Sequence, residues 1–133
     1  MQEENKKKVL YVDDDQLLLD MYRIKFSNEG YDIKIAESGE AGLKILREGY
    51  KPDIFLVDIL MSEMDGHDFV LAIKREKLIP QNAIVVMLTN QTLTDDVNRA
   101  REQDVDGYII KAMTIPSQVV KEVEKIYNSK NKK

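Results

Sequence analysis

The chain lacks cysteine altogether, which excludes disulfide bonds, thiolate metal sites and cysteine nucleophiles. It also lacks any apolar run approaching the roughly 18 residues that a membrane-spanning helix needs. The basic stretch Lys6–Lys8 is followed only by the short run Val9–Val12, which suits a strand and is too short for a signal sequence. An excess of positive charge is missing as well, because the net charge is −4. These absences predict a cytoplasmic protein with no membrane contact and no direct nucleic-acid binding.

The composition is that of one globular domain. Hydrophobic residues make up 43% of the 133 residues and charged residues 33%, which is ordinary for a chain that buries a core. No repeat and no Gly/Ser linker divides the sequence. We therefore expect a disordered N-terminal segment over 1–7, one domain over 8–128 and a Lys-rich C-terminal tail over 129–133, with no output domain.

Short β-type runs alternate five times with helical patterns. Such alternation predicts a parallel sheet with helices on both faces and right-handed crossovers. The α/β class that fits this length best is a flavodoxin-like doubly wound (βα)5 sandwich with a five-stranded sheet in the order 2-1-3-4-5. The predicted strands cover 9–12, 31–36, 53–57, 83–88 and 106–110, and the predicted helices cover 16–28, the stretch between Ser38 and Gly49, 66–77, 94–103 and 116–127.

The apolar positions of the helices predict which faces are buried. In the helix over 16–28, Leu18, Met21, Tyr22 and Lys25 lie near helical spacing. The helix over 94–103 has only Val97 and Ala100 as apolar anchors, so it covers the sheet thinly. Its broad polar face is either a partner surface or a solvated one, and the pattern alone leaves both open.

Polar side chains follow four of the five predicted strands. Asp13–Asp15 come after the first strand, Asp58 ends the third, Thr89 follows the fourth and Lys111 follows the fifth. Taken singly, Asp15 suits a helix cap, Thr89 a turn and Lys111 an exposed surface. Because the carboxyl ends of parallel strands share one edge of the sheet, these side chains can converge at the topological switch point. Their joint placement favours a common site.

The chemistry of these residues suits phosphate and a hard cation. Carboxylates brought close together repel, so one of them takes up a proton unless a cation neutralises the group. Mg²⁺ prefers such oxygen ligands and keeps waters or phosphate oxygens among them. A phosphoryl group held there can be attacked by the Asp58 carboxylate to give an acyl phosphate, with Lys111 and Thr89 as cationic and hydrogen-bonding groups.

The ordered set of motifs closely resembles the receiver domain of two-component response regulators. The resemblance covers about residues 8–128, and although each motif alone is weak, the set in this order is specific. The motifs are Val12-Asp13-Asp14, Asp58, Met64-Asp65-Gly66, Leu88-Thr89 and Gly107-Tyr108-Ile109-Ile110-Lys111.

The resemblance implies a phosphorylation switch. Asp58 matches the phosphoacceptor, which takes a phosphoryl group from the phosphohistidine of a sensor histidine kinase or a phosphotransfer protein. Asp13 and Asp14 match the acidic pair that holds Mg²⁺, with Asp58 and the backbone carbonyl of Leu60 as further ligands. Lys111 matches the lysine that contacts the phosphoryl group. Such a chain is a signalling switch that catalyses its own phosphorylation and dephosphorylation, without being an enzyme.

The resemblance also implies how the signal is read. Thr89 and Tyr108 match the switch pair, in which the threonine reaches toward the phosphoryl group and the aromatic ring turns inward behind it. A downstream protein then binds the face formed by the fourth helix, the fifth strand and the fifth helix. The expected oligomeric state is a monomer or a phosphorylation-dependent dimer.

Four positions depart from the family pattern or modify it. Ser62 and Ala112 stand where most members have proline, and Asn90 stands where a small residue is common. Because a cis bond before a non-proline residue costs about 2.5–4 kcal/mol, we predict a trans Lys111–Ala112 bond. Leu60 cannot hydrogen-bond an attacking water, so we expect a long-lived phosphorylated state.

Two other functions compete with this interpretation. One is a pseudo-receiver that binds a partner without phosphorylation, which the departures at Ser62 and Ala112 keep open. The other is a small Mg²⁺-dependent phosphatase of the haloacid dehalogenase type, although Asp13 and Asp15 meet its Asp-x-Asp pattern only trivially. An FMN-binding flavodoxin is disfavoured, because the acidic first turn lacks donors for phosphate. The single histidine, His67, is expected to have a packing or surface role.

Overall fold

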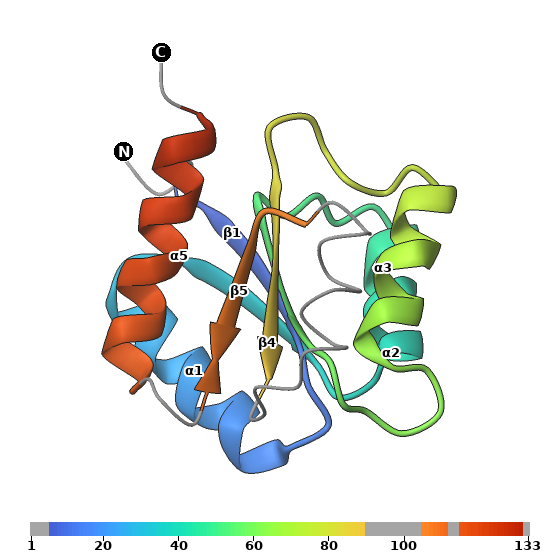
Figure 1. Ribbon diagram of the computed structural model, residues 1–133, viewed down its shortest axis with the longest axis horizontal. Coiled ribbons are helices and arrows are strands. Elements are labelled where there is room, and N and C mark those ends of the chain that lie inside the picture. Colours follow the sequence, from blue (N-terminus) through green and yellow to red (C-terminus); the bar gives the residue numbers. More distant parts are fainter. Residues whose placement is uncertain (1–5, 90–104, 112–114, 132–133) are drawn as a thin grey trace.

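The computed structural model describes residues 6–89, 105–111 and 115–131, and the helix predicted over 94–103 lies outside these ranges. From β1 to β4 the described elements alternate between strand and helix, as predicted, and α5 follows β5 (Figure 1). The strands are β1 (Lys8–Val12), β2 (Asp32–Ala36), β3 (Ile54–Asp58), β4 (Ile84–Thr89) and β5 (Gly107–Ile110), and the helices are α1 (Gln16–Asn28), α2 (Gly39–Arg47), α3 (Gly66–Arg75) and α5 (Pro116–Lys130).

The five strands form one parallel sheet in the order β2-β1-β3-β4-β5, which confirms the predicted doubly wound topology. The register aligns the carboxyl ends of the central strands, because Val12 pairs with Val57 and Asp58 pairs with Leu88. Thr89 in turn pairs with Ile110, the residue before Lys111. The polar residues that follow these strands therefore start from neighbouring positions along one edge, at the bottom of Figure 1.

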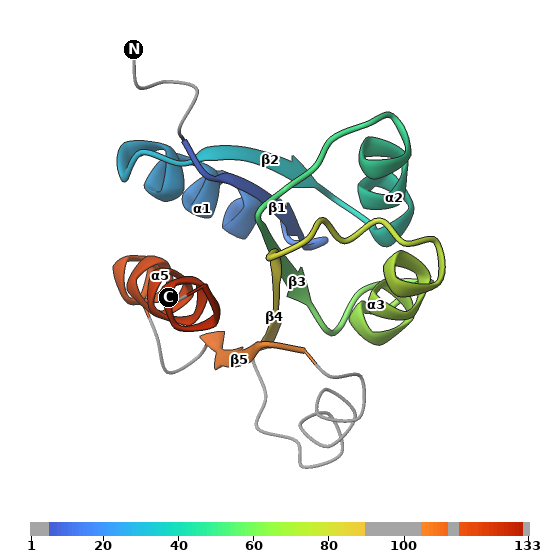
Figure 2. The same cartoon turned by 90° about the horizontal axis from the view of Figure 1, so that it is seen from above.

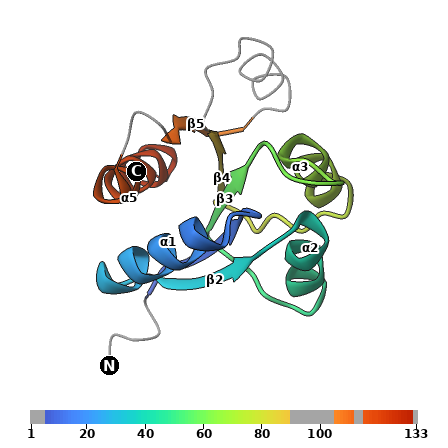
Figure 3. The ribbon, with the colours of Figure 1, turned by 90° about the horizontal axis from the view of Figure 1, so that it is seen from below.

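Of the helices that the structure describes, two cover each face of the sheet. Helices α1 and α5 lie on one face, and α2 and α3 lie on the other (Figures 2 and 3). Strand β1 supplies both cores through its alternation, because Tyr11 packs with the α1–α5 side and Leu10 and Val12 pack with the α2–α3 side. Strands β3 and β4 are buried along their whole length, as expected for the centre of a doubly wound sheet.

Of the positions near helical spacing in α1, Tyr22 is buried and Leu18 packs partly buried against the core on the α1–α5 side. The buried residues of α1 are Leu19, Tyr22 and Phe26, whereas Met21 is 39% exposed. The continuous apolar run Leu17–Leu19 makes the periodicity ambiguous by one position. Edge-to-face contact between Tyr22 and Tyr11, with ring centroids 5.2 Å apart, is part of the packing that selects the observed face.

Two helix ends differ from the predicted bounds for local reasons. Helix α3 ends at Arg75, two residues earlier than predicted, and Lys77 then adopts a left-handed φ of 57°. Helix α5 continues to Lys130, whose ammonium donates to the Ala83 carbonyl at 2.9 Å and pairs with Asp106 at 3.2 Å. These contacts tie the end of α5 to the edge of the sheet.

Gly66 begins α3 in close contact with the end of β3. Its amide donates to the Ile59 carbonyl at 2.8 Å. A Cβ on this residue would overlap the carbonyl oxygen of Asp58 and would lie 2.8 Å from the Ile59 Cα. Glycine is therefore needed here because backbone meets backbone, and this contact positions the loop that follows Asp58.

We predict that Gly66→Ala destabilises the fold by about 1–3 kcal/mol, because neither clashing backbone atom can move freely. Urea unfolding followed by circular dichroism measures the change. Gly39→Ala is the matched control, since its Cβ would first meet the flexible Met64 Sδ at 2.5 Å. The control should change stability by less than about 1 kcal/mol. Equal losses in the two variants would contradict the backbone-contact argument.

Candidate functional site

Three of the predicted site residues meet in one buried ion-pair network. The Lys111 ammonium lies 3.0 Å from Asp13 Oδ2 and 3.1 Å from Asp58 Oδ1. All three side chains are buried, with 6% of Lys111, 1% of Asp13 and 7% of Asp58 exposed. Residues 98 positions apart in the sequence thus form a direct contact, as the shared sheet edge predicts.

Asp14 completes a cluster of three carboxylates with Asp13 and Asp58. One oxygen from each lies within 4.8 Å of the others, and Asp14 is exposed whereas its two neighbours are buried. The cluster therefore has one side open to solvent. Three carboxylate oxygens at this separation fit a hard divalent cation such as Mg²⁺.

The electrostatics of the cluster favour a bound cation or proton. Burial, followed by the charge of Asp13, raises the pKa of Asp58 to about 7, although Lys111 opposes the shift. Burial lowers the pKa of Lys111, but Asp58 and Asp13 outweigh this effect and the net shift is upward. Lys111 therefore stays charged, and its single charge does not compensate the three carboxylates.

Tyr11 contributes to the site, which the sequence pattern did not predict. Its hydroxyl donates to Asp13 Oδ2 at 2.5 Å, and the Asp15 amide donates to Asp13 Oδ1 at 3.0 Å. Burial, followed by the charge of Asp13, raises the pKa of Tyr11 far above its ordinary value, so the hydroxyl keeps its proton. The available signal was the alternation of β1, which places Tyr11 on the same side as Asp13.

Ser62 contributes a second contact that the sequence pattern did not predict. Its amide donates to Asp14 Oδ2 at 3.2 Å, and its hydroxyl lies 3.5 Å from the same oxygen. A proline at this position has no amide hydrogen to donate. The departure from the family pattern therefore links the loop after Asp58 to an exposed carboxylate of the cluster.

The remaining predicted site residues lie at the same sheet edge or beside it. Thr89 is fully buried at the end of β4, and Leu60 is exposed in the loop after Asp58. Tyr108 is half-buried on β5 and packs against the core on the α2–α3 side. Asn90 and Ala112, including the predicted trans bond before Ala112, lie outside the described residues. Asp15 caps α1 by accepting from two backbone amides, as proposed for it singly.

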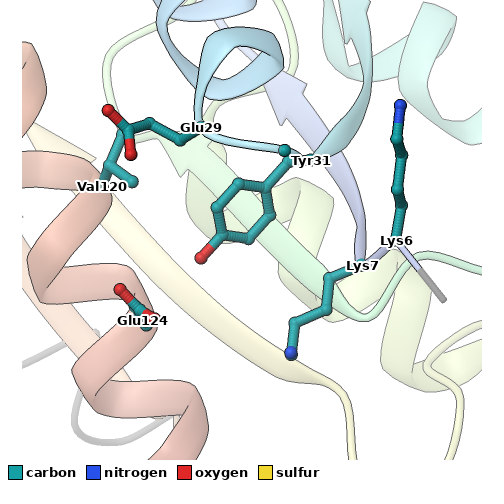
Figure 4. Close-up of a pocket in the computed structure, with 7 residues that line it drawn as sticks. Lys6, Lys7, Glu29, Tyr31, Val120 and Glu124 are labelled. Atoms are coloured by element: carbon teal, nitrogen blue, oxygen red, sulfur yellow. The ribbon is translucent and has the colours of Figure 1, made fainter. Parts of the chain in front are cut away.

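A hollow of about 240 Å³ lies away from this site, at the opposite edge of the sheet. It is lined by side chains of both signs, among them Lys7, Glu29 and Glu124, and Tyr31 points into it (Figure 4). Lys7 precedes β1 and Tyr31 precedes β2, so the hollow lies at the amino ends of the strands. It therefore has no part in the carboxylate cluster.

This fold and this cluster define a class of signalling domain. The sequence profile described as the response regulator receiver domain matches residues 9–124, which is most of the chain. The chain therefore belongs to the response regulator receiver domain family and is a receiver of two-component signal transduction. The family assignment supports the main interpretation over the pseudo-receiver and phosphatase alternatives, and receivers act as signalling switches.

Two of the curated relatives are response regulators. The protein VraR of Staphylococcus saprophyticus is 33% identical over 126 residues, which cover 93% of this chain and 58% of that protein. The DNA-binding response regulator MtrA of Mycobacterium tuberculosis is 33% identical over 118 residues, which cover 89% of this chain and 49% of that protein. The chain thus spans about half the length of the curated relatives that it matches.

Solved structures agree with the fold. A CheY-like receiver domain from Methanospirillum hungatei superposes with a TM-score of 0.83 at 24% identity, covering 96% of this chain and 98% of that one. The N-terminal domain of a response regulator/sensory box/GGDEF protein from Carboxydothermus hydrogenoformans gives a TM-score of 0.78 at 31% identity, covering 92% of this chain and 94% of that one.

Within the described ranges, the helices are too short or too polar to cross a membrane.

The raised pKa of Asp58 predicts how stability depends on pH without Mg²⁺. The native state keeps a proton on Asp58 that the unfolded chain has already released, so stability falls as the pH rises from about 4 to about 7. Asp58→Asn cannot lose this proton, and we expect it to be about 2 kcal/mol more stable than the wild type at about pH 8. Urea unfolding of both proteins in the presence of a metal chelator, at about pH 5 and about pH 8, measures the difference in the free energy of unfolding.

The control for this prediction is Asp20→Asn, which removes an exposed carboxylate paired with Arg23 at 3.5 Å. It should follow the pH profile of the wild type. Addition of Mg²⁺ should restore the stability of the wild type at high pH and leave Asp58→Asn largely unchanged. An Asp58→Asn variant with an unaltered pH profile would contradict the assignment of the titrating group.

The contact between Ser62 and Asp14 predicts an effect on cation binding. Ser62→Pro removes the amide that competes for Asp14 Oδ2, and we expect Mg²⁺ to bind about two- to fivefold more tightly. Ser62→Ala keeps the amide and removes only the hydroxyl at 3.5 Å, so its affinity should stay close to that of the wild type. Calorimetric titration with MgCl₂ measures all three proteins. Weaker binding by Ser62→Pro would show instead that the amide orients Asp14 for the cation.

Proposed function

We propose that the chain accepts a phosphoryl group on Asp58 in a Mg²⁺-dependent reaction, from the phosphohistidine of a sensor histidine kinase or a phosphotransfer protein. The observation that carries this proposal is the buried Asp58 carboxylate, held at 3.1 Å by Lys111 inside a three-carboxylate cluster. A carboxylate oxygen attacks phosphorus, the nitrogen–phosphorus bond of the donor breaks, and an aspartyl phosphate forms on Asp58.

The residues of the cluster support this chemistry in distinct ways. Asp13 and Asp14, with Asp58 and the carbonyl of Leu60, would hold Mg²⁺, which when bound neutralises charge on the phosphoryl oxygens. Asp58 must be ionised to attack, and its pKa of about 7 allows this near neutral pH. Lys111 then has a phosphoryl oxygen as a new partner beside Asp58. Thr89, buried at the neighbouring strand end, supplies a hydroxyl on the same edge.

Tyr108 supports a switch that runs along β5. Its hydroxyl is buried, and its ring packs against the core on the α2–α3 side. Movement of Thr89 toward the phosphoryl group would change the space available to this ring on the adjacent strand. We infer that a downstream protein binds the face of the fourth helix, β5 and α5, of which the fourth helix lies outside the described residues.

Exposed apolar side chains near the site support a protein donor. Leu17, Met21 and Ile24 are 68%, 39% and 53% exposed, and their i, i+4, i+7 spacing puts them on one face of α1. Leu60, two residues after Asp58, is 49% exposed. A protein that reaches the buried carboxylate of Asp58 must pack closely around it, and these side chains offer it an apolar surface.

Other partner assignments follow from the family and the charge. MtrA is named as DNA-binding, but the chain matches only about half of that protein, and its net charge of −4 gives the receiver no basic surface excess. We propose that the receiver itself contacts proteins and no nucleic acid. A cytoplasmic location, one receiver domain over 8–128 and a monomer or phosphorylation-dependent dimer remain part of this proposal.

The test is incubation with acetyl phosphate, with and without Mg²⁺, followed by intact-mass analysis. We expect the wild type to gain the mass of one phosphoryl group only when Mg²⁺ is present. Asp58→Ala should gain none, because it lacks the nucleophile, and Asp53→Ala is a control that keeps the cluster. After removal of the donor, the added mass should persist well beyond a few seconds, because Leu60 cannot orient an attacking water.

Two outcomes would overturn the proposal. Phosphorylation of Asp58→Ala to the level of the wild type would place the acceptor elsewhere. A wild type that binds Mg²⁺ but gains no mass from acetyl phosphate or from a phosphorylated histidine donor would support the pseudo-receiver alternative.

A further inference from the structure

We propose that Tyr11 is a positioning residue for Lys111. In this proposal the Tyr11 hydroxyl holds the buried Asp13 Oδ2, so that Lys111 can exchange Asp13 for a phosphoryl oxygen. The inference rests on the proposed function and adds to it a residue outside the motif set. It concerns the part of the reaction in which the lysine changes partners.

The geometry puts two donors on one carboxylate oxygen. Asp13 Oδ2 accepts from the Tyr11 hydroxyl at 2.5 Å and from the Lys111 ammonium at 3.0 Å. The same ammonium also lies 3.1 Å from Asp58 Oδ1. Lys111 is thus shared between two carboxylates, and only one of these carboxylates has a tyrosine as a second donor among the hydrogen bonds described.

Burial makes the second donor important. Asp13 is 1% exposed, so water has little access to Oδ2 if Lys111 moves away. Its other oxygen is already bonded to the Asp15 amide at 3.0 Å. A buried carboxylate oxygen that loses its donor carries a large desolvation cost. With the Tyr11 hydroxyl in place, departure of Lys111 leaves Oδ2 hydrogen-bonded, and the movement is correspondingly easier.

Tyr11 is well suited to stay in place while the lysine moves. It belongs to β1, it is fully buried, and its ring packs edge-on against Tyr22 at 5.2 Å with an interplanar angle of 80°. Asp13 follows it by two residues, on the same side of the extended chain. The aromatic pair fixes the ring, and the strand fixes its distance from the carboxylate.

The test compares Tyr11→Phe with Tyr22→Phe. Each variant removes one hydroxyl from the same pair of packed rings, but only Tyr11→Phe removes the bond to Asp13. We expect Tyr11→Phe to bind beryllium fluoride, a mimic of the phosphoryl group, about tenfold more weakly at saturating Mg²⁺. Its phosphorylation by acetyl phosphate should slow by a similar factor. Mg²⁺ affinity alone should change less than about threefold, because the charge of Asp13 remains.

A double-mutant cycle tests whether the effect passes through Lys111. In a Lys111→Ala background there is no ammonium to release, so Tyr11→Phe should cause no further loss of beryllium fluoride affinity. Additive losses in the cycle would show that Tyr11 acts independently of the lysine and would overturn the inference. Equal losses of Mg²⁺ and beryllium fluoride affinity would also overturn it, because they would assign Tyr11 to shaping the cation site.

A measurement on the wild type serves if Tyr11→Phe does not fold. In NMR spectra, beryllium fluoride should shift the Lys111 ammonium resonance while the Tyr11 hydroxyl proton stays hydrogen-bonded and protected from exchange. Loss of that protected proton on binding would contradict the inference. Failure of the wild type to bind beryllium fluoride or to be phosphorylated counts against the proposed function itself, whereas normal behaviour of both wild type and Tyr11→Phe counts against the role of Tyr11 only.

Discussion

The ammonium of Lys111, buried between Asp13 and Asp58, is the interaction on which the site depends. Its distances to the two carboxylates are nearly equal, at 3.0 and 3.1 Å, so one positive charge is shared by two buried negative charges. A single buried pair gives little net stability after desolvation. Here the arrangement leaves excess negative charge at the carboxyl ends of the strands, because exposed Asp14 adds a third carboxylate. A cation therefore stabilises the site, and burial, followed by the charge of Asp13, raises the pKa of Asp58.

The sheet makes this arrangement possible by bringing distant residues to one edge. Pairing of β1 with β3 and of β4 with β5 sets the ends of these strands side by side, so that Asp13, Asp58 and Lys111 meet without any long loop. Close contact of Gly66 with the Asp58 backbone then fixes where the following loop can run. Apolar packing on both faces therefore maintains a polar cluster in which each residue alone would be unfavourable when buried.

Much of this architecture was predictable because it depends on the hydrophobic periodicity and on the order of the elements along the sequence. Alternating strands and helices specify the doubly wound sheet, and strand ends identify Asp13, Asp58 and Lys111 as neighbours. The buried positions of α1 were only partly predictable, because the apolar run Leu17–Leu19 makes the periodicity ambiguous by one position. The contact of Tyr22 with Tyr11 also depends on a partner in another element. The donors to Asp13 and Asp14 were missed for a related reason. The alternation of β1 places Tyr11 on the side of Asp13 but does not show that its hydroxyl reaches the carboxylate, and a serine in a loop carries no periodic signal. Both roles depend on side-chain and backbone directions that only the folded structure defines.

The two unpredicted donors act on different parts of the same cluster. Tyr11 donates to the buried Asp13 from within the core at 2.5 Å, whereas the Ser62 amide donates to the exposed Asp14 from the loop that follows β3, at 3.2 Å. A donor to a buried oxygen lasts because water cannot replace it, and a donor to an exposed oxygen competes with water and with cations. The contact between Tyr11 and Asp13 therefore affects which partner Lys111 takes. The contact between Ser62 and Asp14 affects how readily Asp14 is available to Mg²⁺. Residues outside the motif set can in this way adjust cation binding and phosphoryl binding separately, while the acidic residues and the lysine stay the same.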